Sequence, residues 1–421
     1  MAEPLRIGLA ARDITPEIGE PLSGYIHREP PSLGVLDPLT LQALALDDGE
    51  KAAVVIVTDL VGSDGPATQE LRDAVGRATG VAPEYIVWHS VHTHASPSFH
   101  RYRGMERASK AYLQSVIAAA GDAAREAMET ARPSRGFHAK ASVAGLSHNR
   151  RRADGPIDDE ASIVTLKRED ADTIHLAHWQ CHPVCLGSEN RYLSGDYVGA
   201  FRRSAAAASG ELSLYLNGCC GDLNPRQRGY EGATATGREL AAAALGAQPQ
   251  EPVPLEPLRI ARRSAPFPLK RDIDLEVTRE YLASERERLA TLDDPLHLRE
   301  CQAMVDWAEA LLRALEQDAL PPDPEGEITA IRMGGVALVF LPCEALCAIG
   351  LSVKAQSPVP VTLPVSCTGK VVGYLGTPDE FQWGGYELDV ATRYYSLLPF
   401  RPEAGQVLVD AALATLHEVW S

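Results

Sequence analysis

Two apolar runs separated by a helical stretch constrain this fold more than any other feature of the sequence. KAAVVIVTDL at 51–60 predicts a buried strand, ATQELRDAVGRATG at 67–80 has helical spacing and ends in glycine, and EYIVWHSV at 84–91 predicts the next strand. A strand–helix–strand unit places its two strands parallel in one sheet. We therefore expect an α/β protein, with its chemistry where such strands end.

The remaining pattern predicts a mixed β-structure flanked by helices. Strands are expected at 173–184 and 211–222, a hairpin at 328–342 around two glycines, and helices at 109–131, 198–209, 234–247, 344–357 and 402–420. A segment rich in proline and charge, 248–274, precedes two charged helices at 276–318. We interpret 276–318 as an inserted helical arm or lid within a single domain spanning 1–421. A solvated hairpin with only structural duties is the alternative.

Composition and charge exclude several classes of protein. The net charge of -17 and the pI near 5.2 argue against a nucleic-acid or anionic-membrane binder. The N-terminal stretch lacks the features of a secretory signal, and no apolar run is long enough to span a membrane. The eight cysteines are expected to be reduced thiols, and the cytoplasm is the expected location. Nothing in the sequence indicates an oligomeric state.

Histidines gather where the second strand of the first unit ends, in HSVHTHASP at 89–97. If the chain is still extended there, His92 and His94 leave the same face, and one imidazole can bind a metal beside the other. Two core histidines without a ligand are the alternative. His89 would point the other way and is given no role. His182, in QCHPVC, also follows a predicted strand, whereas His175 and His178 lie inside it and are interpreted as structural.

Three further positions have both a functional and a structural interpretation. Glu344 lies at a strand-to-helix junction, where it is either a carboxylate ligand or an acidic residue favoured by the helix dipole. Tyr374 and Tyr386 are twelve residues apart and would ordinarily be half-buried tyrosines. The segment NGCCGDLNPR, 217–226, forms either an active-site turn or simply a turn.

In their order along the chain, several segments resemble the neutral/alkaline, non-lysosomal ceramidase family, specifically its N-terminal catalytic domain. The segments are GLAARDITPEIGEPLSGYIHR (8–28), LGVLDPLTLQALALDDG (33–49), HTHASP (92–97), SHNRR (147–151), CHPV (181–184), SGDYVG (194–199), NGCCGDLNPR (217–226), LPCEALCAIG (341–350) and GYLGTPDEFQWGGYE (373–387). The resemblance implies a ceramidase-like α/β catalytic domain. It departs from the family at Asn224, which replaces a serine once proposed as a nucleophile, so a serine acyl-enzyme at that position is not available. The chain also ends soon after the tyrosine segment, and we expect no C-terminal immunoglobulin-like domain.

The resemblance implies a zinc-dependent hydrolase of an N-acyl (amide) bond. Carried over residue by residue, Zn²⁺ is expected on His92, His182, Glu344 and Tyr374, a donor set that suits zinc except for the uncommon phenol. His94 is expected to handle protons. Arg150, or its neighbour Arg151, and Tyr386 are expected to orient the substrate or stabilise an oxyanion. Asp196 and Asp222 are considered as acceptors that fix a histidine tautomer.

Other functions remain open at this stage. The substrate is expected to be a small acylated molecule, soluble or less lipidic than ceramide, and an esterase or deacylase would use the same metal. A metal-free cysteine hydrolase would use Cys219 or Cys220 as nucleophile. A non-catalytic binding protein would keep the fold and lose the reaction. A different zinc site can be drawn from four cysteines: Cys181, Cys185, Cys343 and Cys347.

Overall fold

Two β-sheets form the centre of the molecule. The computed structural model describes residues 4–28, 30–248 and 250–421, so the first three positions of the N-terminal stretch and position 249 of the proline-rich segment lie outside the described residues. The larger, nine-stranded sheet has the order β11-β9-β8-β6-β1-β3-β4-β5, with β13 added beside β6. Its strands are β1 (Arg6–Asp13), β3 (Thr40–Asp47), β4 (Ala52–Thr58), β5 (Ile86–Ser90), β6 (Arg132–Ser142), β8 (Glu160–Arg168), β9 (Ile174–Trp179), β11 (Leu212–Asn217) and β13 (Glu251–Val253).

The second sheet has four strands in the order β14-β15-β16-β18. They are β14 (Leu258–Pro266), β15 (Glu325–Met333), β16 (Val336–Phe340) and β18 (Val361–Val365). Three two-stranded pairs lie outside both sheets: β2 (Gly34–Val35) with β10 (Tyr192–Leu193), β7 (Ser147–Asn149) with β12 (Leu223–Pro225), and β17 (Glu344–Ala345) with β19 (Tyr374–Leu375). The predicted hairpin is confirmed, because β15 and β16 pair antiparallel around Gly334–Gly335.

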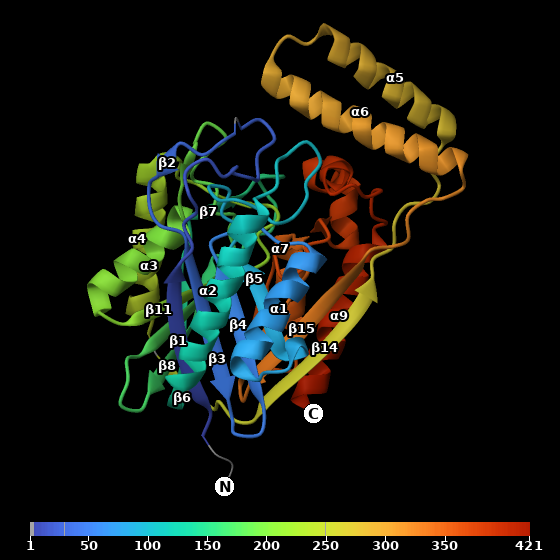
Figure 1. Ribbon diagram of the computed structural model, residues 1–421. Helices are drawn as coiled ribbons and strands as arrows, with labels where there is room; N and C mark the ends of the chain where they lie inside the picture. Colours follow the sequence, from blue (N-terminus) through green and yellow to red (C-terminus); the bar gives the residue numbers. More distant parts are fainter. Residues whose placement is uncertain (1–3, 29, 249) are drawn as a thin grey trace.

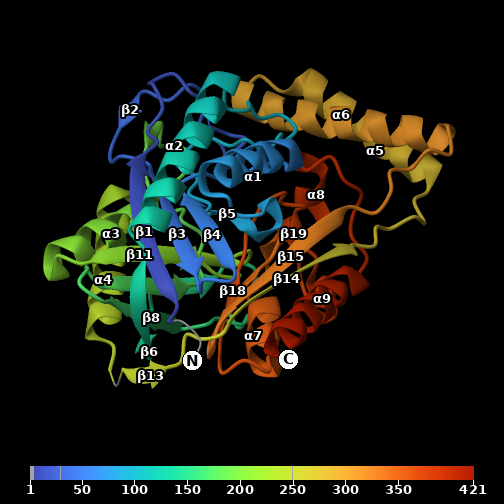
Figure 2. The same ribbon diagram turned by 60° about the horizontal axis from the view of Figure 1, so that its bottom comes forward.

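Nine α-helices flank the sheets in the described part of the chain (Figures 1 and 2). They are α1 (Gly65–Thr79), α2 (Lys110–Glu129), α3 (Asp196–Ser209), α4 (Gly229–Gly246), α5 (Leu275–Thr291), α6 (Pro295–Glu316), α7 (Cys347–Gln356), α8 (Ala391–Tyr394) and α9 (Glu403–Trp420). The two helices predicted within 276–318 are present as α5 and α6, which pack against each other and project from the body of the molecule (Figure 1). None of the helices in the described ranges is both long and apolar enough to cross a membrane.

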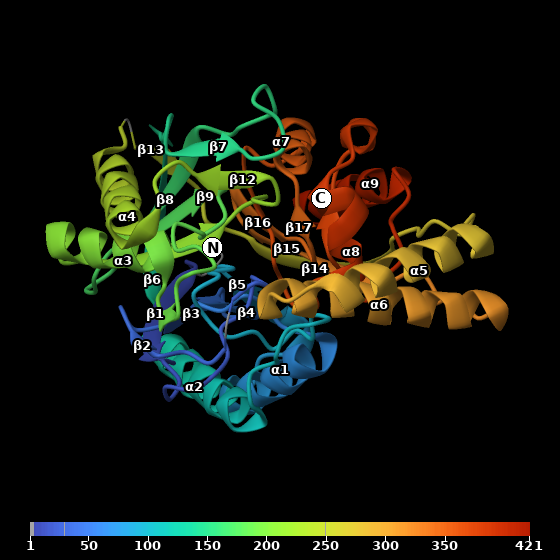
Figure 3. The ribbon, with the colours of Figure 1, turned by 90° about the horizontal axis from the view of Figure 1, so that it is seen from above.

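Successive side chains of a buried strand point to opposite faces of its sheet, and this explains how the sheets and helices form layers. In β4, Val55 and Val57 face the core shared with the four-stranded sheet, whereas Val54 and Ile56 face α1 and α2. The same alternation in β16 points Leu338 toward the larger sheet, while its neighbours pack under α7 and α9. Seen from above, helix pairs α1–α2 and α3–α4 and the group α7–α9 surround the strands (Figure 3). The predicted parallel pairing of β4 with β5 is confirmed.

One helix begins earlier than the sequence predicts. Helix α4 starts at Gly229, five residues before the predicted start. A Cβ at Gly237 would lie 2.5 Å from the backbone of α3, at Tyr197 and Phe201. Gly237 therefore allows the two helices to pack closely, and this packing outweighs the poor helix propensity of glycine.

Helix α9 touches the backbone that follows β19, and this contact yields the first prediction. A Cβ at Gly405 would lie 1.8 Å from the carbonyl oxygen of Gly376. We expect Gly405→Ala to lower the free energy of unfolding by about 1–3 kcal/mol, measured by urea denaturation. Gly246→Ala in α4 is the matched control, since nothing lies within 4 Å of its added Cβ. Equal stabilities of the two variants would contradict the predicted close contact.

Candidate functional site

Side chains from three distant segments meet at the centre of the molecule. His92 follows β5, His182 follows β9, and Glu344 begins the short strand β17. The His92 and His182 ring centroids are 5.1 Å apart. Glu344 Oε2 lies 3.0 Å from Nε2 of His92 and 3.1 Å from Nε2 of His182, and all three side chains are buried. The proposed ligands His92, His182 and Glu344 therefore share one centre.

Backbone carbonyls set the orientation of both imidazoles. Nδ1 of His92 lies 2.6 Å from the carbonyl oxygen of Val61, and Nδ1 of His182 lies 2.6 Å from that of Cys220. A carbonyl oxygen only accepts, so each Nδ1 carries a proton, and in a neutral ring Nε2 then presents its lone pair. Such an outer hydrogen bond is the usual support of a metal-binding histidine. Two lone pairs and a carboxylate facing one another in a buried site fit a cation placed among them.

His94 belongs to the same cluster. The ligand nitrogens of His92, His94 and His182 all lie within 4.8 Å of one another. Both ring nitrogens of His94 are buried and have no hydrogen-bond partner in the described part of the chain. Burial and the neighbouring histidines lower the pKa of His94, so its ring is neutral. A Cβ at Gly24 would lie 2.4 Å from this ring, so glycine is required there.

The backbone at His92 differs from the expectation. The sequence argument assumed an extended chain, but β5 ends at Ser90 and His92 has a φ of 72°, in the left-handed region. Its amide donates to the carbonyl oxygen of Leu60. The rings of His92 and His94 still lie together, 4.9 Å between centroids, but a wound loop and not strand alternation brings them there.

Glu344 has the position of a ligand and not of a helix cap. It pairs with Tyr374 in the β17–β19 ladder, and α7 begins only at Cys347. Its second oxygen, Oε1, accepts a hydrogen bond from the hydroxyl of Tyr395. Burial alone would raise the pKa of Glu344, but His92 and His182 hold it well below its usual value. The carboxylate is therefore anionic between two imidazoles.

The pKa of His182 also depends on its burial and on the neighbouring Cys220 and Glu344. Burial lowers its pKa, whereas Cys220 and Glu344 raise it, and the net result is a pKa of about 9. Without a cation in the site, this imidazole would therefore be protonated at neutral pH. A bound metal would take the place of that proton on Nε2.

Tyr374 and Arg150 lie beside this centre. The ring of Tyr374 stacks against that of His182, with centroids 6.4 Å apart, and Nη2 of Arg150 donates to its hydroxyl at 3.3 Å. Burial and the charge of Glu344 raise the pKa of Tyr374, so it is a neutral phenol unless a metal displaces its proton. Nε of Arg150 donates to Oε1 of Glu387 at 2.7 Å, which fixes the guanidinium.

Tyr386 lines a cavity beside the histidine centre, which we call the mouth of the site. Its side chain is 48% exposed, and its ring lies 6.1 Å from that of Tyr374. It belongs to the same cavity as Arg150, which has a volume of about 540 Å³. The remaining lining residues are Arg151, Arg152, Trp383, Gly384, Gly385 and Glu387. Arg151 also lines the mouth, but it is only 4% exposed and donates to the carbonyl oxygen of Gly384 at 2.6 Å, so Arg150 is the better placed of the two.

Two aspartates support loops and do not orient histidines. In the described part of the chain, Asp196 accepts hydrogen bonds from the backbone amides of Cys185, Leu186 and Tyr197. Asp222 accepts from the Cys347 amide at 2.7 Å and from Asn149 at 2.8 Å, which holds the start of α7. The interpretation of either as a histidine partner is wrong, because carbonyl oxygens perform that role.

The cysteine-based zinc site is also wrong. All eight cysteines are buried free thiols. In the described residues, the group whose ligand atoms come together is the three histidines, and Cys181, Cys185, Cys343 and Cys347 do not form one. His89 is buried on β5, where its Nε2 accepts from the amide of Asn217 at 3.1 Å.

Three contacts of the site were not predicted. Tyr395 bonds Glu344, Glu387 holds Arg150, and the buried Arg28 donates to the carbonyl oxygen of His94. Glu387 directly follows Tyr386, and Arg28 ends the segment 8–28, so proximity to recognised segments was a usable signal for these two. No such signal marks Tyr395.

Solved structures provide the comparison. No family model matches the chain. A structure described as a ceramidase complexed with C2 aligns with a TM-score of 0.76 at 17% identity and covers 99% of this chain and 76% of that one. The neutral ceramidase from Pseudomonas aeruginosa aligns with a TM-score of 0.73, also at 17% identity, and covers 100% and 75%. The mixed α/β fold expected from the sequence is thereby confirmed.

Proposed function

We propose that this chain, which has the neutral-ceramidase fold, is a zinc-dependent hydrolase that cleaves an N-acyl (amide) bond. The observation that carries the proposal is the approach of two tautomer-fixed imidazoles, His92 and His182, to one carboxylate oxygen of Glu344. Two imidazole nitrogens and a carboxylate oxygen are a donor set that zinc prefers, and a catalytic site leaves a further position open. Tyr374 is proposed as an additional ligand from the paired strand β19.

The surrounding residues support hydrolysis. Bound zinc would supply a Lewis acid that lowers the pKa of water toward ~7. His94, neutral and without a hydrogen-bond partner in the described ranges, is proposed to take and return the proton. Arg150 and Tyr386 line the mouth and are proposed to hold the carbonyl oxygen as it gains charge.

The mouth of the site supports a small, polar substrate. Of the residues that line it, three are arginines and two are glycines, and Trp383 is the large apolar one. Arg152 lies 4.6 Å from the centre of the Trp383 ring. Guanidinium groups in such a lining suit polar, hydrogen-bond-accepting atoms of a substrate. We therefore propose an acylated small molecule that is soluble or less lipidic than ceramide.

The alternatives differ in how well the structure supports them. An esterase or deacylase would use the same centre. A cysteine hydrolase is less well supported, because Cys219 and Cys220 are fully buried. Burial raises the pKa of Cys219 to about 12, whereas at Cys220 the effect of burial is outweighed by Cys367 and His182, which lower its pKa well below the usual value. A binding protein without activity would share the same centre and would show no hydrolysis.

Metal removal tests the proposal. We expect a chelator to abolish hydrolysis of an N-acyl substrate found in a panel of N-acyl and O-acyl compounds, and one equivalent of zinc to restore it. Iodoacetamide should leave the rate unchanged. Activity that survives chelation but is lost on alkylation would contradict the proposal and favour a cysteine nucleophile. Preference for the O-acyl compounds would identify an esterase.

A further inference from the structure

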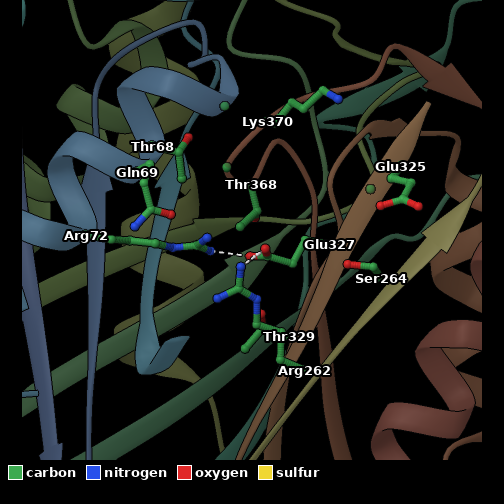
Figure 4. A pocket seen from close by; sticks show the side chains of 13 residues that line it. Thr68, Gln69, Arg72, Arg262, Ser264, Glu325, Glu327, Thr329, Thr368 and Lys370 are labelled. Carbon is green, nitrogen blue, oxygen red and sulfur yellow. Dashed lines mark hydrogen bonds and ion pairs between the residues drawn. The ribbon is translucent and has the colours of Figure 1, made fainter. Parts of the chain in front are cut away.

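A second cavity, of about 270 Å³, lies between α1 and the strands β14 and β15. Its walls come from α1, both strands and the loop after β18 (Figure 4). The lining residues that matter here are Arg72, Arg262, Lys370, Glu325 and Glu327. Three cationic side chains therefore face two carboxylates, although the chain as a whole carries a charge of -17.

Glu327 is shared between the two arginines. Arg72 reaches it from α1 and Arg262 from β14, as Figure 4 shows. Arg72 is only 5% exposed and is fixed further by its Nε, which donates to the carbonyl oxygen of Ile86 at 2.9 Å. One carboxylate thus balances two guanidinium groups. Burial lowers the pKa of both arginines to about 10, and for Arg262 the charge of Arg72 adds to that effect.

Further donors complete the cavity. Arg262 and Ser264 are two apart on β14 and therefore point to the same face. Lys370 extends along Gly65, where its Cδ would lie 3.7 Å from an added Cβ. Thr329 and Thr368 are part of the same lining, although the Thr368 hydroxyl donates to the backbone carbonyl oxygen of Ser366 at 3.2 Å. Cations and hydroxyl groups from separate walls suit an oxyanion that accepts hydrogen bonds in several directions.

We propose that this cavity binds a small phosphate-type oxyanion, held by Arg262, Lys370 and Ser264 above the Arg72–Glu327 pair. Its volume also admits a small organic phosphomonoester. The site is separate from the histidine centre, and the three cations of its lining outnumber its two carboxylates.

Calorimetry of the whole protein with inorganic phosphate, and in a second arm with glycerol 3-phosphate, tests the site at constant ionic strength. We expect saturable binding that weakens by about tenfold or more in Arg262→Gln and in Lys370→Gln. Arg263→Gln is the matched control, because Arg263 lies next on β14 but faces Glu418 at 3.2 Å. Tighter binding of the ester would identify an organic ligand.

Absence of saturable binding of either anion would overturn the proposal, as would equal weakening in Arg262→Gln and Arg263→Gln. Arg72 is left intact in this experiment, because its buried guanidinium also joins α1 to β5 and β15. The unfolding midpoint of each variant is measured alongside, so that lost binding is assigned only to variants that remain folded.

Discussion

Replacing His92 by alanine is expected to remove both the metal and the activity. The bound zinc should fall from about one equivalent to a small fraction, and kcat/KM should fall by more than about 10³-fold. The physical reason is that Nε2 of His92 is one of two imidazole nitrogens beside Glu344, and alanine leaves that carboxylate with a single imidazole. Elemental analysis and steady-state kinetics on the same preparation measure the two effects together.

Two further variants make this result specific. His182→Ala should show the same loss, and the double variant should lose little more, because residues that act as one unit are not additive. His417→Ala, an exposed histidine of α9, is the matched control and should keep full zinc and full activity. A chelator should lower the unfolding midpoint of the parent protein but not that of His92→Ala. A zinc-replete and active His92→Ala protein would contradict the proposed centre.

Much of the fold follows from strands whose residues are apolar on both faces. Strand β4 was predicted from its apolar run, and in the structure every residue after its first is buried. Strand β6 was not predicted, since its buried positions are small residues such as Ser134, Gly136 and Ala139. Such a strand shows no alternation of large apolar side chains, although its backbone pairs with β8 from Ser134 to Ser142. The apolar content of a segment therefore predicts a buried strand only where large apolar side chains fill the space beside it.

Sequence reasoning predicted three of the residues that meet at this centre but not the groups that support them. His92, His182 and Glu344 follow strands and have the chemistry of a metal site, so sequence reasoning and resemblance found them. The hydrogen bonds that orient the imidazoles come from the carbonyl oxygens of Val61 and Cys220, and every residue type carries that group. Sequence reasoning therefore assigned this duty to aspartates, whose side chains instead hold loop backbones.

Replacing Arg150 by glutamine is expected to separate catalysis from metal binding. The guanidinium lies 3.3 Å from the Tyr374 hydroxyl and at the mouth of the site, where a developing oxyanion would need a donor. Loss of one such donor costs about 10²–10³ in kcat. Zinc content should stay at its parental value, since Arg150 is a cation and no ligand. Single-turnover kinetics together with elemental analysis measure the two quantities.

Matched variants decide whether Arg150 acts on the reaction or on the fold. Arg150→Lys should recover part of the rate, because it keeps the charge but not the forked geometry that Glu387 and the substrate share. Arg151→Gln should mainly lower stability, since Arg151 is 4% exposed and bonded to the carbonyl oxygens of Glu380 and Gly384. If Arg151→Gln lost the rate and Arg150→Gln kept it, the proposed roles of these neighbours would be reversed. If Arg150→Gln lost its zinc, the residue would belong to the support of the metal centre and not to the stabilisation of charge on the substrate.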